Sequence, residues 1–186
     1  MTLGAGGHTD KVTRLIPLGG AQLINASVDK SIRVWNWSQG RSVRGMCGEA
    51  GLGRRGEVRS LALVPDQTQL LVGGFFDDQE KGLHPIRVYQ WPAGTIQGLL
   101  HAHDRPVQSL AVSPAGDLLA SGDQRGVVRL WRKEGDTFQH VAGLEAHTTS
   151  VTSLAFDPAV SGLLVSTSSD GSACLWQASS TGFRQK

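Results

Sequence analysis

The chain has 186 residues, of which 39% are hydrophobic and 18% are charged, proportions typical of a globular protein that buries a core. Its formal net charge of +2 is too small to predict binding to nucleic acid or to a membrane surface from bulk electrostatics. No apolar run approaches the roughly 20 residues that a membrane-spanning helix needs, and the first residues, MTLGAGGHTDK, lack the apolar region of a signal peptide. We therefore expect an intracellular protein, cytoplasmic or nuclear, without membrane contact.

One segment recurs along the chain. It begins at Val12, Val58, Val107 and Val151, so that successive starts lie 46, 49 and 44 residues apart. A period in the forties is typical of architectures in which each unit buries its faces against its neighbours. The second copy is degraded, because an insertion separates VRSLALVPDQTQLLVGG from PIRVYQW.

An arginine-rich stretch, residues 41–59, follows the first copy. We interpret it as a solvated connecting loop, because no aromatic residues interleave with the arginines to stack on bases. The alternative is nucleic-acid or chromatin binding through its basic side chains. These are Arg41, Arg44, Arg54, Arg55 and Arg59.

The insertion in the second copy, residues 75–85, is the strongest candidate for a functional loop. Phe75 and Phe76 are followed by Asp77 and Asp78, and aromatic residues flanked by charge are typical of an interface anchor with a polar rim. The alternative is that one phenylalanine packs in the core and the rest forms a solvated loop. The sequence leaves both interpretations open.

The last copy shows how one unit is built. Aliphatic and β-branched runs at 151–156, 163–167 and 173–176 are separated by turn residues, and Pro158 ends the first run because proline cannot donate to a strand ladder. A fourth strand is expected between copies, as at 138–144. These runs are too apolar for a sheet with one wet face, so both faces must be covered, which radial stacking of small sheets achieves.

A pattern of Gly-His or Ala-His, then about 20 residues, then Asp, with Trp six positions after that Asp, resembles the Trp-Asp (WD) repeat of β-propellers. In the third copy Arg125 stands where the acid is expected, with Asp123 nearby, and in the second copy Tyr89 replaces Trp. The residues that carry the resemblance are Gly7, His8, Asp29 and Trp35; Ala102, His103 and Trp131; and Ala146, His147, Asp170 and Trp176.

The resemblance implies an all-β fold of about four four-stranded antiparallel blades in an open or incomplete propeller. The repeat region is predicted over 1–178, and the head, MTLGAGGHTD, supplies only the end of one strand. The tail, 179–186, is expected to be disordered, because it is too short and polar for an outer strand. Members of this family most often close with seven blades, so we expect a fragment or short form of a longer protein, with pairing to another chain or to itself as alternatives. The repeats are predicted at 8–37, 54–92, 103–132 and 147–177.

In the family, a buried network links the Trp N–H to a hydroxyl, that hydroxyl to His, and His to the turn Asp. Such groups satisfy one another when buried, and their recurrence indicates architecture rather than catalysis. We predict no enzyme activity and no cofactor. The third copy is expected to be looser because it lacks the acid at register. The predicted network residues are His8, Asn25, Ser27, Asp29 and Trp35; His103, Ser121 and Trp131; and His147, Ser166, Ser168, Asp170 and Trp176.

A metal site at His101 and His103 is not expected, because His103 belongs to the repeat and no further ligand lies at metal spacing. Propellers of this family act as platforms for protein partners, which implies an interaction scaffold in a multiprotein assembly. The loops between repeats and before the Trp strand should form the binding face. The predicted contact residues are Phe75, Phe76, Asp77, Asp78, Arg54, Arg55, Lys30, Arg105 and Arg125.

Overall fold

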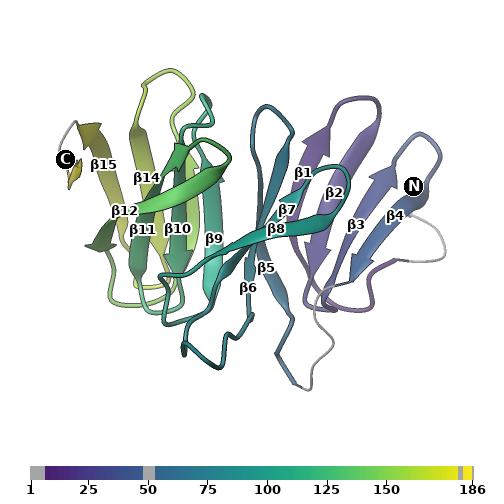
Figure 1. Cartoon of the computed structure of the whole chain (residues 1–186), viewed down its shortest axis with the longest axis horizontal. Coiled ribbons are helices and arrows are strands. Elements are labelled where there is room, and N and C mark those ends of the chain that lie inside the picture. The colour runs from purple at the N-terminus through teal and green to yellow at the C-terminus, as the bar shows by residue number, and fades with distance from the viewer. Residues whose placement is uncertain (1–6, 48–52, 180–181, 186) are drawn as a thin grey trace.

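The computed structural model describes residues 7–47, 53–179 and 182–185 and shows four antiparallel sheets that fan out into an open arc (Figure 1). We name the sheets blades 1 to 4 in chain order. No blade closes onto another across the gap between blades 1 and 4 among these residues, so the predicted open propeller of four four-stranded blades is confirmed. The strands are β1 (Val12–Leu18), β2 (Gln22–Ser27), β3 (Ser31–Asn36) and β4 (Arg41–Cys47) in blade 1; β5 (Val58–Leu63), β6 (Gln69–Gly74), β7 (Ile86–Gln90) and β8 (Thr95–Leu100) in blade 2; β9 (Val107–Val112), β10 (Leu118–Asp123), β11 (Val127–Glu134) and β12 (Thr137–Glu145) in blade 3; and β13 (Val151–Phe156), β14 (Leu163–Ser168), β15 (Ala173–Ser179) and β16 (Gly182–Gln185) in blade 4.

Each blade is built from four strands that are consecutive in the chain, in the spatial orders β1-β2-β3-β4, β5-β6-β7-β8, β9-β10-β11-β12 and β13-β14-β15-β16. The first strand of each blade lies innermost, beside the first strand of the next blade. The head strand expected from the sequence falls mostly on residues 1–6, which lie outside the described residues.

Two expectations about loops are wrong. The tail is not disordered over 182–185, because β16 pairs with β15 from Ser179↔Gly182 to Trp176↔Gln185 and gives blade 4 its fourth strand. Ladder hydrogen bonds come from the backbone, so a polar composition does not prevent an outer strand. The arginine-rich stretch is also not all loop, because residues 41–47 form β4.

The core lies between blades rather than within them. Three clusters of buried side chains fill the contacts between blades 1 and 2, 2 and 3, and 3 and 4. Leu61, Leu110 and Leu154 occupy equivalent inner-strand positions, and each packs toward the preceding blade. A Cβ on Gly122 would come within 2.5 Å of Val151 of the next blade, so the close approach of blades 3 and 4 requires glycine there.

Candidate functional site

In blade 1 the predicted polar network forms, with an asparagine in place of the hydroxyl residue. Trp35 Nε1 donates to Asn25 Oδ1 at 3.1 Å, and His8 lies 2.9 Å from both Asn25 Oδ1 and Asp29 Oδ2. Ser27 does not belong to it, because its hydroxyl instead donates to the Asp10 carbonyl. Burial alone would raise the pKa of Asp29, but hydrogen bonds to its carboxylate outweigh burial and lower that pKa to about 2.

In blade 3 the network is complete, so the expectation of a looser third copy is wrong. Trp131 Nε1 donates to Ser121 Oγ at 2.8 Å, Ser121 Oγ lies 2.7 Å from His103 Nε2, and His103 Nδ1 lies 2.9 Å from Asp123 Oδ2. Asp123 therefore supplies the acid. Arg125, which stands at the expected register, only donates its backbone N–H to Asp123 Oδ1.

Both ionisable groups of the blade 3 network are fully buried. Burial lowers the pKa of His103 below its ordinary value, against the opposing effect of the Asp123 carboxylate. Burial by itself would raise the pKa of Asp123, but its hydrogen bond with His103 and two backbone N–H donors hold that pKa below the ordinary value. A neutral imidazole beside a carboxylate is thus the favoured state.

In blade 4 the imidazole and the acid are connected through a serine that the sequence analysis missed. Trp176 Nε1 donates to Ser166 Oγ at 3.0 Å, and Ser166 Oγ lies 2.8 Å from His147 Nε2. His147 Nδ1 lies 2.7 Å from Ser172 Oγ but 3.7 Å from the Asp170 carboxylate, to which Ser172 also donates. Of the two serines predicted here, Ser166 is the network member. The other, Ser168, donates to the Thr149 carbonyl instead.

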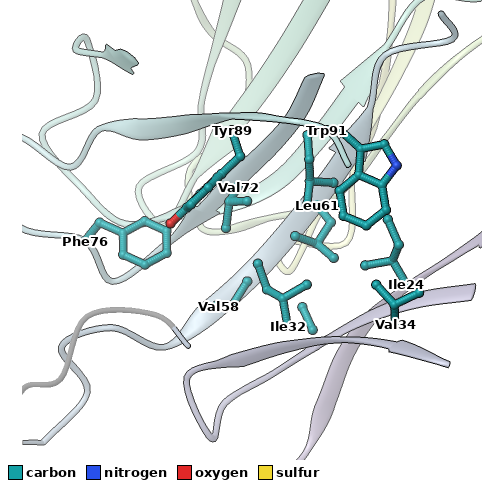
Figure 2. Close-up of a cluster of buried hydrophobic side chains, with 11 residues drawn as sticks. Ile24, Ile32, Val34, Val58, Leu61, Val72, Phe76, Tyr89 and Trp91 are labelled. Atoms are coloured by element: carbon teal, nitrogen blue, oxygen red, sulfur yellow. The ribbon is translucent and has the colours of Figure 1, made fainter. Parts of the chain in front are cut away.

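Blade 2 replaces the polar network with apolar side chains. Val72 occupies the position of Ser121, and Tyr89 occupies that of Trp131, as the strand registers show. Phe76 packs beside them in the cluster between blades 1 and 2, with 1% of its surface exposed (Figure 2). The prediction that Phe76 contacts a partner is therefore wrong, and the alternative that one phenylalanine packs in the core describes it.

The loops predicted to form the binding face gather along one edge of the arc, the lower edge in Figure 1, which we call the loop end. Backbone hydrogen bonds join each loop before a blade to the loop between that blade's second and third strands. Such bonds run from Val28 N–H to the Lys11 carbonyl, from Gly56 N–H to the Phe75 carbonyl, from Gln124 N–H to the Pro106 carbonyl, and from Ser169 N–H to the Ser150 carbonyl.

Phe75 is half-buried at this end, beneath two arginines. Arg54 lies over its ring, with Cζ 3.8 Å from the ring centroid, and Arg59 Cζ lies at 5.4 Å. Both guanidinium groups also donate to the buried carboxylate of Glu57, Arg59 Nε at 3.1 Å and Arg54 Nε at 3.4 Å. We call these four residues the Phe75 cluster. The Arg54 side chain remains 55% exposed, so the cluster presents a cation over an aromatic ring to solvent.

The acidic part of the insertion is anchored beside this cluster. Asp78 Oδ2 lies 2.8 Å from His101 Nε2, and the Asp78 N–H donates to the Leu83 carbonyl. Burial alone would raise the pKa of Asp78, but its hydrogen bonds, foremost with His101, hold it below the ordinary value. A shallow pocket between the insertion and blade 2 is lined by Arg55 and Asp77, among others. His101 and His103 thus face different carboxylates, and within the described ranges no group of three ligating side chains gathers for a metal.

Comparison with known families supports the assignment that the networks suggest. The family described as WD domain, G-beta repeat (WD40) matches residues 2–36, 94–132 and 138–177, which together make up more than half of the chain. The chain belongs to the WD-repeat family. The three matched stretches include the polar networks of blades 1, 3 and 4, whereas most of blade 2, with its apolar substitute, lies between them.

Three individual relatives show sequence identities of 25% to 28% to this chain. The chain is 28% identical over 177 residues to Protein ROOT INITIATION DEFECTIVE 3 of Arabidopsis thaliana, covering 87% of this chain and 36% of that protein. It is 26% identical over 182 residues to the LST8 homolog of Drosophila pseudoobscura pseudoobscura, covering 93% and 53%. It is 25% identical over 185 residues to the Target of rapamycin complex subunit wat1 of Schizosaccharomyces pombe, covering 95% and 54%. The chain therefore spans between 36% and 54% of the length of these relatives.

The remaining predicted contact residues of the WD-repeat arc lie apart from the Phe75 cluster. Arg125 is exposed in blade 3, with its guanidinium 3.8 Å from the Asp104 carboxylate, and Arg105 donates to the Asp104 carbonyl. Lys30 lies in the loop between β2 and β3 of blade 1. The sequence analysis placed Glu57 in a loop of the binding face but did not predict that it anchors two arginines, and it missed His101 as part of the site. The signal for Glu57 was an acid placed between Arg54 and Arg59, whereas nothing in the sequence pairs His101 with the insertion.

The arginines of the nucleic-acid alternative do not form one group. Arg41 and Arg44 lie on the outer strand β4, where Arg44 donates to carbonyls of Pro92 and Ala93 in blade 2. Arg54 and Arg59 belong to the Phe75 cluster at the loop end. Nucleic-acid binding stays a prediction, for which a steep salt dependence is the diagnostic. Within the part of the WD-repeat chain that the structure describes, no helix is long and apolar enough to cross a membrane.

Proposed function

We propose that this chain is a non-enzymatic scaffold that binds a protein partner within a multiprotein assembly through the Phe75 cluster and the adjoining acidic insertion. The observation that carries the proposal is the Arg54 guanidinium stacked 3.8 Å above Phe75 at the loop end. Arginine and aromatic side chains are enriched at protein interfaces, and here the Arg54 guanidinium is already bonded to the buried carboxylate of Glu57 before a partner binds.

The residues around the Phe75 cluster favour a partner surface with an apolar or acidic centre and basic side chains at its rim. The cation–aromatic pair suits an apolar or acidic group, while Asp77 and the exposed Glu80 beside it suit a basic rim. The insertion also interrupts the repeat only in blade 2, and departures from a repeat commonly mark a binding loop. Among the relatives, wat1 is by its name a subunit of a complex, which agrees with a scaffold role.

The buried networks support a structural rather than catalytic role for their hydroxyls. Ser121 and Ser166 are fully buried, and each is already bonded to a tryptophan and a histidine. A serine nucleophile requires access to a substrate beside an oxyanion site. The proposal therefore assigns these serines to stability.

The test is affinity capture from cell extract followed by mass spectrometry, with the native chain and three variants. Arg54→Ala and Asp77→Ala alter the proposed site, and Arg41→Ala is the matched control because Arg41 is exposed on β4 away from the loop end. Circular dichroism first establishes that each variant is folded. A protein that the native chain and Arg41→Ala retain, but that the other two lose at least about tenfold, is expected for a hot-spot contact.

Two outcomes argue against the proposal. Equal retention by all variants would show that the Phe75 cluster is not the binding site. Loss of every captured protein after nuclease treatment would favour the nucleic-acid alternative, and a steep dependence of duplex binding on salt would then be expected.

A further inference from the structure

A groove lies between blades 2 and 3, along their outer strands β8 and β12 (Figure 1). It encloses about 370 Å³, which lies at the lower end of the range of small-ligand sites and suits one large side chain. Its floor is apolar, because Val88, Trp131 and Phe138 line it and each is at most 6% exposed. The Phe75 cluster does not line this groove.

The corresponding junction between blades 1 and 2 contains an arginine. The strand registers give three equivalent positions on the outer strands, each paired with the residue just before a bulge: Arg44 with Val34, Gly98 with Val88, and Ala142 with Leu130. Arg44 reaches across to blade 2, where its guanidinium donates to the carbonyls of Pro92 and Ala93. Ala142 packs against the core between blades 3 and 4. Gly98 has no side chain, and a Cβ there would meet nothing within 4 Å, so the groove remains open where blade 1 places a guanidinium.

The charge of the groove suits a cation. Asp136 lines it at the turn between β11 and β12, and its carboxylate makes no ion pair within the described ranges. No lysine or arginine is among the described residues that line the groove. His101 is paired with the Asp78 carboxylate, and burial, aided by the nearby positive charge of Arg129, lowers the pKa of His140, so that its imidazole is neutral at pH 7. A cationic occupant is therefore complementary to the groove.

The two walls of the groove are joined from inside by Gln69 of β6, which is 3% exposed. Its Nε2 donates to the Asp136 carbonyl at 2.7 Å and to Gln97 Oε1 at 3.1 Å. The amide thus connects blade 2 to the turn of blade 3 that carries the carboxylate. Because the walls are already held together, an occupant does not have to order them, which lowers the entropic cost of binding.

We infer that the groove between β8 and β12 binds an arginine side chain presented by a protein partner, in the place that Arg44 takes between blades 1 and 2. The guanidinium donates to the Asp136 carboxylate, while its methylene stem covers the apolar floor. Arginine fits better than lysine because its planar fork donates to two acceptors at once, as that of Arg44 does, and packs on aromatic rings. This inference does not rest on the proposed function of the Phe75 cluster.

The test is an NMR titration of the ¹⁵N-labelled 186-residue chain with four capped pentapeptides. Each peptide has two alanines on either side of a central residue, which is arginine, lysine, citrulline or leucine. The arginine peptide is expected to bind with a millimolar or lower dissociation constant and to shift the backbone signals of Gly98, Gln139 and His140, which line the groove. It should bind at least about threefold more tightly than the lysine peptide and about tenfold more tightly than the two uncharged ones, because charge-assisted, forked hydrogen bonds are the stronger kind.

Variants of the chain test the position of the site. Gly98→Arg builds the side chain that corresponds to Arg44 and should weaken binding of the arginine peptide at least about tenfold, because it fills the groove. Gly45→Arg is the matched control, since it adds the same charge on outer strand β4 at a site where a Cβ also meets nothing within 4 Å. Asp136→Asn should weaken binding about two- to fivefold, the range of a partly exposed ion pair, whereas Glu134→Gln, beside the same turn but outside the groove lining, should leave it unchanged.

Several results would overturn the inference. It is wrong if the arginine peptide binds no more tightly than the citrulline peptide, if folded Gly98→Arg keeps the native affinity, or if Asp136→Asn does. Preference for the lysine or the leucine peptide equally overturns it, because the groove would then be a general cation site or an apolar one. Asp136 is exposed, so its variant decides the matter even where Gly98→Arg does not fold.

Discussion

Replacing Ser121 with alanine tests whether the buried network stabilises blade 3. The Ser121 hydroxyl accepts from Trp131 Nε1 at 2.8 Å and lies 2.7 Å from His103 Nε2, and all three side chains are at most 2% exposed. Without the hydroxyl, the indole N–H and the imidazole nitrogen are left unpaired in the core. Each unpaired group costs about 1–3 kcal/mol, so we expect Ser121→Ala, which leaves two such groups, to lower the free energy of unfolding by about 2–6 kcal/mol.

Ser109 provides the control for Ser121. Its Oγ is also buried in blade 3, but it has no hydrogen-bond partner among the described residues. Ser109→Ala should therefore change the free energy of unfolding by less than about 1 kcal/mol, because it removes an unpaired hydroxyl. Urea denaturation followed by circular dichroism measures both variants. Equal losses for the two serines, or a loss below about 1 kcal/mol for Ser121→Ala, would refute the reasoning.

Three further predictions follow from packing and protonation. Phe76→Ala should cost about 3–5 kcal/mol because it empties a core position, whereas Phe75→Ala should cost about 1–2 kcal/mol, and comparable urea midpoints would contradict this contrast. Burial lowers the pKa of His103 in the folded state, so the unfolded chain binds more protons than the folded chain. The free energy of unfolding should therefore fall as the pH drops below 6.5. A pH series in which His103→Gln keeps the full native slope would exclude His103 as the cause. Gly122→Ala should cost about 1–3 kcal/mol because a Cβ meets the next blade, while Gly45→Ala, which meets nothing within 4 Å, should change stability by less than about 1 kcal/mol in thermal melts.

The WD repeat was predictable because its residues have fixed places on strands and turns. Spacing alone placed His8 and Trp35 in one network and His147 and Trp176 in another. In both repeats the acid, Asp29 or Asp170, caps the turn before the strand that carries the tryptophan. It failed for Asp123 because the acid of blade 3 occupies the strand position that Ser27 and Ser168 hold in blades 1 and 4, two residues before the turn acids, and still lies 2.9 Å from His103.

The candidate site was less predictable than the fold. Phe75 and Phe76 are adjacent and identical, so the sequence does not distinguish the buried ring from the half-buried one. The path of the chain after β6 decides which ring enters the core. The outer strand of blade 4 was missed for a different reason. Its pairing uses backbone groups, which hydropathy patterns do not report.

The contiguous order of strands within each blade has a consequence for how the protein is made. Among the described residues, no strand of one blade waits for a segment from the far end of the chain, because β1 to β4, and each later set of four, pair only among themselves. Every sheet can complete its hydrogen bonds as soon as its own residues leave the ribosome, and each finished blade then offers a surface on which the next one condenses. Synthesis from the N-terminus would therefore assemble the arc in sequence, because the main contacts join strands of one blade or of two neighbouring blades.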